Sequence, residues 1–167
     1  ACFQSKIHCP ANYECNIQCL ADSINKQVCG AAKFNCSQSS KCNILCQSES
    51  NDHACDNAFV KWPINSDESS LNCQGDYSCA NLASSSKIQQ GWDSIKTNND
   101  NEDYTLICNG QNSCHNNIIQ CPDNARCSIL CDGYASCQGD AIQCGNTANS
   151  QCNITCRNGP SPVSYTH

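Results

Sequence analysis

Cysteine is the residue in this chain whose number and spacing can do chemistry. Twenty of the 167 residues are cysteine, and methionine is absent. Thiols at this density oxidise to disulfides in an oxidising compartment, whereas a reducing cytosol keeps them open or loads them with metal. A zinc site needs paired short Cys-x2-4-Cys knuckles. The segment CNIQC at 15–19 has Cys-x3-Cys spacing, but its strand alternation argues against a metal site. We therefore expect disulfides, and neither a metal nor another cofactor.

The cysteines recur in a register of four. The third and fourth groups are shortened and keep only the first and fourth cysteines. First cysteines are separated by 27, 26, 24, 35 and 23 residues, the size of one coil of a parallel β-solenoid. The six groups are Cys2, Cys9, Cys15 and Cys19; Cys29, Cys36, Cys42 and Cys46; Cys55 and Cys73; Cys79 and Cys108; Cys114, Cys121, Cys127 and Cys131; Cys137, Cys144, Cys152 and Cys156.

The shortened groups indicate how the columns pair. They lose the second and third cysteines together, so these two are expected to bond each other. For the rest, either each fourth cysteine joins the next coil's first, or first and fourth join within a coil, as in Cys2 with Cys19. Short corners favour the first version because they bring the sulfurs together with little backbone travel. Its bonds are Cys19–Cys29, Cys46–Cys55, Cys73–Cys79, Cys108–Cys114 and Cys131–Cys137, beside Cys9–Cys15, Cys36–Cys42, Cys121–Cys127 and Cys144–Cys152.

This version leaves Cys2 and Cys156 without a partner in the molecule. With coils about 4.8 Å apart, they lie roughly 25 Å from each other, far beyond disulfide reach. They are expected to pair only between molecules.

The segment that ends at each fourth cysteine reads as a strand. In CNIQC at 15–19 and CSILC at 127–131, both cysteines and the central aliphatic residue alternate onto one face, which must be the core. The expected core column is Ile17, Ile44, Leu71, Leu106, Ile129 and Ile154, and the outward column is Asn16, Asn43, Ser70, Thr105, Ser128 and Asn153. A second strand precedes the second cysteine, with Ile7, Phe34, Val60, Ile119 and Ile142 inward. The fold expected is all-β: a disulfide-stapled parallel β-helix, or β-solenoid, of about six coils.

This solenoid is expected to be one domain over residues 1–156, with longer, irregular coils at 55–113. That middle part contains Trp62, Trp92 and Tyr104. These aromatics either fill space where a bridge is missing or form a sugar-stacking ligand patch. The acids Asp100, Glu102 and Asp103 resemble a weak calcium loop but lack EF-hand spacing.

Composition excludes several function classes. The net charge of -6 argues against nucleic acid as a partner, and no apolar run is long enough for membrane insertion. No signal peptide is visible, so the chain reads as a mature secreted product. The four histidines have no recurring acid or nucleophile near them and no catalytic motif occurs, so an enzyme is not expected.

Two sequons predict N-glycosylation at Asn153 and at Asn35. The sequon of Asn35 is less favourable because its middle residue is a cysteine. The segment 157–167 contains Pro160 and Pro162, which forbid a regular central strand. It is expected to be a C-terminal tail or linker, an arm onto a neighbour, or an O-glycan carrier.

The spacing Cys-x6-Cys-x5-Cys-x3-Cys, with its CxIxC strand, resembles the cysteine-rich β-helical repeats of secreted and surface proteins of protists and algae. The resemblance covers essentially the whole chain and implies fold and extracellular location rather than an activity. Insect antifreeze solenoids are also cysteine-rich, but their Thr-x-Thr column is missing here.

The function expected is that of an extracellular structural protein, which self-associates head to tail in a filament or surface coat. Open strand edges at both ends of a solenoid pair with a neighbour unless they are capped. The alternative is a secreted adhesin or carbohydrate-binding module that uses the aromatic patch to bind glycans.

Overall fold

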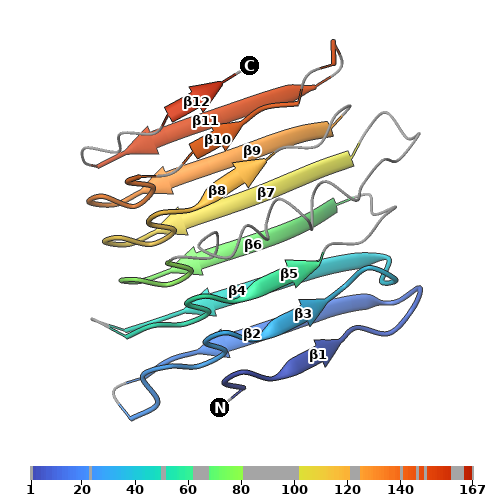
Figure 1. Ribbon diagram of the computed structural model, residues 1–167, viewed down its shortest axis with the longest axis vertical. Helices are drawn as coiled ribbons and strands as arrows, with labels where there is room; N and C mark the ends of the chain where they lie inside the picture. The colour runs from blue at the N-terminus through green and yellow to red at the C-terminus, as the bar shows by residue number, and fades with distance from the viewer. Residues whose placement is uncertain are drawn as a thin grey trace.

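The structure is a computed structural model that describes residues 2–22, 24–49, 52–61, 68–80, 102–120, 125–139, 141–145, 147–148, 150–158 and 164–166. Within these ranges every regular element is a strand. The strands stack in chain order, with the two termini at opposite ends of the stack (Figure 1).

Each coil contributes one long strand to a single parallel sheet. The long strands are β2 (Glu14–Leu20), β4 (Lys41–Gln47), β6 (Glu68–Gln74), β7 (Glu102–Asn109), β9 (Ala125–Asp132) and β11 (Gln151–Arg157). They lie in the order β11-β9-β7-β6-β4-β2, and every pair is parallel. The expected all-β parallel solenoid is therefore the fold of this chain.

Short strands form a second column opposite the long sheet. They are β1 (Lys6–His8), β3 (Lys33–Asn35), β5 (Phe59–Lys61), β8 (Ile118–Gln120), β10 (Ala141–Gln143) and β12 (Ser164–Thr166). They form two three-stranded sheets, β1-β3-β5 and β12-β10-β8. Among the described residues, five of the six coils show both strands; the fourth shows β7 alone, because 81–101 lie outside them.

The core is the stack of inward residues that the repeat predicts. Equivalent residues pair directly across the long sheet, so Ile17 lies beside Ile44 and Leu106 beside Ile129. Most inward residues of the short strands are buried as well, with Phe34, Ile119 and Ile142 each at most 1% exposed, whereas Ile7 on β1 is only partly buried. Ile154 is only partly buried, which corrects the prediction for that residue. Its strand, β11, is the edge strand of the sheet within the described part of the chain.

The structure assigns part of the expected tail to the fold itself. Arg157 belongs to β11, and residues 164–166 form β12, which pairs in parallel with β10. The two prolines do not prevent this, because both precede β12 and the strand lies at a sheet edge.

Candidate functional site

The disulfides follow the corner pattern. Five bonds join a fourth cysteine to the next coil's first, with Cα atoms 5.8 to 5.9 Å apart: Cys19–Cys29, Cys46–Cys55, Cys73–Cys79, Cys108–Cys114 and Cys131–Cys137. Three join second to third cysteines: Cys9–Cys15, Cys36–Cys42 and Cys144–Cys152. Cys127 is also disulfide-bonded, and its expected partner, Cys121, lies outside the described residues. These bonds contradict the alternative in which first and fourth cysteines pair within one coil.

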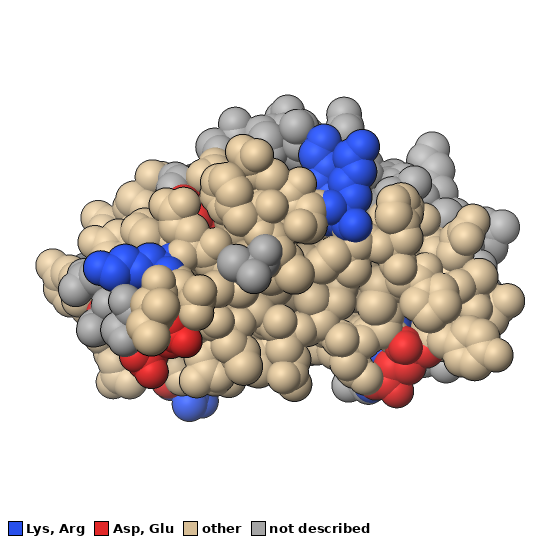
Figure 2. Space-filling model, turned by 90° about the horizontal axis from the view of Figure 1, so that it is seen from below, with Lys and Arg blue, Asp and Glu red and all other residues tan. Residues whose placement is uncertain are grey.

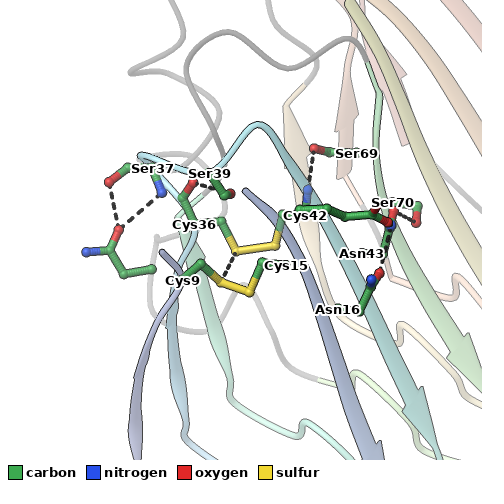
Figure 3. Close-up of a disulfide and its surroundings, with 12 residues drawn as sticks. Cys9, Cys15, Asn16, Cys36, Ser37, Ser39, Cys42, Asn43, Ser69 and Ser70 are labelled. Atoms are coloured by element: carbon green, nitrogen blue, oxygen red, sulfur yellow. Dashed lines mark hydrogen bonds between the residues drawn. A yellow bond between two sulfur atoms is a disulfide. The ribbon is translucent and has the colours of Figure 1, made fainter. Parts of the chain in front are cut away.

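Neighbouring bridges stack along the axis. Cys9 Sγ lies 3.5 Å from Cys36 Sγ, which places Cys9–Cys15 against Cys36–Cys42 (Figure 3). The sulfurs of Cys9, Cys36 and Cys42 all lie within 4.8 Å of one another, a spacing that could suit a metal. Metal binding by cysteine requires thiolates, however, and these sulfurs are all held in disulfides.

Coils without the second bridge fill its place with other side chains. Tyr104 pairs with Cys127 in the strand register, so it occupies the third-cysteine position, and it is only 2% exposed. The sugar-stacking role expected for Tyr104 is therefore wrong, and the space-filling interpretation holds for it. Trp62 and Trp92 lie outside the described residues. In the third coil Ser69 takes this position, and its hydroxyl accepts a hydrogen bond from the Cys42 N–H at 3.3 Å (Figure 3).

Two exposed free cysteines mark the two ends of the solenoid. Cys2 is the first cysteine of the first coil, and Cys156 is the fourth cysteine of the last. In the corner register a first cysteine such as Cys2 pairs with a fourth cysteine, and a fourth cysteine such as Cys156 pairs with a first one, each from the adjoining coil.

The N-terminal end carries most of the exposed apolar side chains. Of the large apolar side chains that are exposed in the described residues, only Tyr134 belongs to another coil. Figure 2 looks onto this end, and the described residues in the middle of the face are uncharged. The four residues, which we call the N-terminal apolar face, are Phe3, Tyr13, Leu20 and Ile24, 48%, 69%, 51% and 86% exposed.

Sequence reasoning missed this surface, although the sequence contains one signal for it. Leu20 follows a fourth cysteine at a position where other coils have Gln47, Gln74 or Asp132. An apolar residue in an otherwise polar outward column indicates a contact that the other coils do not make. Exposed apolar side chains gathered in one terminal coil are typical of an interaction surface.

The C-terminal end exposes the edge of the core itself. Cys127 and Ile129 on β9 are 1% and 2% exposed, whereas their neighbours Cys152 and Ile154 on β11 are only partly buried. The difference arises because β11 is the edge strand of the long sheet. An edge strand of this kind can pair with another strand.

A polar ladder runs along the outer face of the long sheet. Asn43 Nδ2 donates to Asn16 Oδ1 at 3.0 Å, and the Ser70 hydroxyl donates to Asn43 Oδ1 at 3.0 Å (Figure 3). Nearer the C-terminal end the same face is hollowed into an open groove of about 260 Å³. Its lining includes the half-exposed Ile107 and Leu130 together with Asn153, Thr155 and Arg157.

The two sequon asparagines differ in their surroundings. Asn153 is exposed at the groove, in the outward column where the sequence placed it. Asn35 is half-buried, and its Oδ1 accepts a hydrogen bond from the Ser37 hydroxyl at 2.7 Å. Glycan attachment is therefore sterically easier at Asn153.

Two of the described histidines lie near a polar side chain of their own or the neighbouring coil. His8 Nδ1 lies 3.3 Å from Asn35 Nδ2, within hydrogen-bonding distance, whereas His53 Nδ1 lies 3.8 Å from Asp56 Oδ2, beyond it. His167 and Asp100 lie outside the described residues, and the side chains of Glu102 and Asp103 are not described either.

Among the described residues, no helix is long and apolar enough to cross a membrane.

Comparisons with protein-family models, with curated proteins and with solved structures found no match to this chain.

Proposed function

We propose that this chain is an extracellular structural protein, a rigid β-solenoid subunit that stacks head to tail into a filament or surface coat. The observation that carries the proposal is the complementarity of the two ends. One end is the N-terminal apolar face, the other is the open edge of β11, and each has an exposed free cysteine. A contact between unlike ends is heterologous, so it propagates instead of closing.

The repeat register predicts how the two ends meet. If a second copy continues the stack, β2 of the second copy pairs with β11 of the first. This pairing is parallel and in the same register as that between β2 and β4 within one chain. Ile154 then lies beside Ile17 of the second copy, and the core column continues across the junction. Cys156 then lies next to Cys2 of the second copy, in the same arrangement as the fourth cysteine of one coil and the first cysteine of the next. Their Cα atoms would be about 6 Å apart, a separation typical of disulfides.

The disulfides support an oxidising, extracellular-type environment. The resemblance of the cysteine register to secreted and surface repeats of protists and algae supports the same location. We place the assembled protein outside the cell, where disulfides persist, with a glycan at Asn153 on the outer face.

Electron microscopy and non-reducing gels of native protein test this function. We expect filaments with an axial repeat of roughly 30 Å, from six coils at about 4.8 Å each plus the junction. Non-reducing gels should show a ladder that collapses on reduction. Cys2→Ser should remove the covalent ladder and leave non-covalent filaments. A folded protein that stays monomeric at every concentration would overturn the proposal.

A second candidate function is glycan binding, as an adhesin or carbohydrate-binding module. The groove on the outer face supports it, because aliphatic Ile107 and Leu130 lie there beside hydroxyl and amide groups that could bind a sugar. A glycan array with intact protein and with Leu130→Asp tests this candidate, which requires binding that the substitution removes. Trp62→Ala and Trp92→Ala test the remaining aromatics in the same assay.

A further inference from the structure

The C-terminal strand occupies a place that belongs to the next coil. β12 pairs with β10 in the same parallel manner as β10 pairs with β8, so it stands where the short strand of a seventh coil would lie. In the residues that the structure describes, no long strand accompanies it, since β11 is the edge of the long sheet. β12 therefore occupies the short-strand position of a seventh coil, and the long-strand position of that coil is not occupied by any described strand.

A second copy stacked on this end needs the same place. Within the chain, β1 and β2 form the first coil, and each pairs with its counterpart in the second coil. A second copy whose β2 pairs with β11 must therefore bring its β1 onto the edge of β10. That edge is the one β12 covers, so the two strands cannot be bound together.

We propose that β12 is a displaceable cap, which competes with β1 of a second copy for the edge of β10 and so limits head-to-tail growth. This inference rests on the proposed function, because the competing strand belongs to a second copy. It differs from the expected arm onto a neighbour, since β12 lies on its own molecule.

The extent of pairing favours exchange once a second copy is present. The cap contributes three paired residues, Ser164 to Thr166. A second copy contributes a three-residue β1 and a seven-residue β2, and it covers the partly buried Ile154. The exchange gains strand pairing and apolar burial, at the cost of bringing two molecules together.

The described contacts also show where the cap can separate from the body. Asn158 Nδ2 donates to Asp132 Oδ1 at 2.6 Å, and the Gly133 N–H donates to the Arg157 carbonyl at 3.3 Å. These bonds hold the chain to the previous corner as far as Asn158. Removal of residues 159–167 should therefore uncap β10 and leave β11 in place.

Truncation after Asn158 tests the cap. Because the intact chain must release β12 before it can grow, we expect truncation to lower the critical concentration for assembly at least about tenfold. Sedimentation and light scattering measure this concentration. A synthetic peptide of residues 159–167 should restore the inhibition, whereas a scrambled peptide should not. Cys2→Ser in both chains separates the strand contact from covalent trapping.

Proline substitutions provide a test in the full-length chain. Successive N–H groups of an edge strand point alternately to the partner strand and to solvent. One of Ser164→Pro and Tyr165→Pro must therefore remove a hydrogen bond to β10, and the other is its matched control. The variant that loses the hydrogen bond to β10 should have the critical concentration of the truncated chain. The other variant should have the critical concentration of the intact chain.

The outcomes separate the cap from the proposed function. If intact and truncated chains assemble at the same concentration, or if truncation prevents assembly, the cap is refuted and the filament stands. If both chains stay folded and monomeric, the filament and the cap are both refuted.

Discussion

The third-cysteine position of the long strands holds either a disulfide-bonded cysteine or another side chain that fills the same space. Tyr104 is the clearest case, because it lies in the third-cysteine column and is nearly inaccessible to solvent. Tyr104→Ala should lower the free energy of unfolding by about 3 kcal/mol or more, the usual cost of an aromatic cavity. Tyr104→Phe is the matched control and should cost far less. Denaturant unfolding of both variants measures this difference, and equal losses would show that the ring is not the cause.

Neighbouring residues on one strand should respond oppositely to the same substitution. Ile129→Asp places a carboxylate in the core beside Leu106 and Ile154, and should cost more than about 4 kcal/mol or abolish secretion. Ser128 is exposed, so Ser128→Asp should be tolerated. Secretion yield and thermal unfolding compare the pair. Similar losses in both variants would contradict the assigned faces.

One turn of the N-terminal apolar face depends on an ionised carboxylate. Asp22 Oδ1 accepts hydrogen bonds from the N–H groups of Asn25 at 2.6 Å and Ile24 at 2.9 Å, and these bonds, that of Asn25 foremost, lower the pKa of Asp22 below its ordinary 3.8. The turn is therefore stabilised above the ordinary pKa and loosens as the pH falls through the lowered one. Protection of the Ile24 amide, measured as its exchange rate relative to an unstructured peptide at the same pH, should be lost only in that acidic range. In Asp22→Ala this protection should be absent at neutral pH too.

At the scale of the elements, corners set how closely coils approach. Gly110 lies two residues after a fourth cysteine, with φ of +133°, and a Cβ there would lie 2.5 Å from the carbonyl oxygen of Gly75 in the coil below. Gly110→Ala should therefore destabilise the protein by at least about 2 kcal/mol. At Gly30 the nearest atoms belong to the ring of Phe3, at 3.1 Å, and φ is not left-handed. Gly30→Ala is the control and should show the smaller shift in thermal unfolding.

The strands could be predicted because their signals are local. Alternation in CNIQC or CSILC predicts which side chains of the strand point inward and which point outward. The joint loss of the second and third cysteines in two coils predicts that these two cysteines bond each other. Even Tyr104 could have been assigned inward, since it precedes Leu106 and Cys108 as a third cysteine would.

The ends could not be predicted in the same way. Whether Ile154 is covered depends on the absence of a neighbouring strand, and the sequence of β11 does not encode that absence. β12 lacks the cysteine register, and its pairing with β10 joins residues far apart in the chain.

At the scale of the whole molecule, cross-links replace the thick core that this composition cannot supply. Each bridge is typically worth about 2 to 4 kcal/mol, and the bridges lie throughout the solenoid. Reduction should therefore unfold the chain outright, with loss of the cooperative transition in circular dichroism and calorimetry. Cys2→Ser, which removes only a free thiol, should leave the transition unchanged. A reduced chain that still melts cooperatively would show that the apolar column alone suffices.

The two sets of bridges also determine how the molecule responds to tension along its axis. Strands pulled apart from the end of a stack separate one coil at a time, which offers little mechanical resistance. In the second coil, however, Cys19–Cys29, Cys36–Cys42 and Cys46–Cys55 bypass both corners, so only residues 29–36 and 42–46 can lengthen. Full extension of a coil with both bridges therefore releases less than half of its contour length. An assembled fibre would yield in short, limited steps and keep its covalent continuity after its sheets have opened.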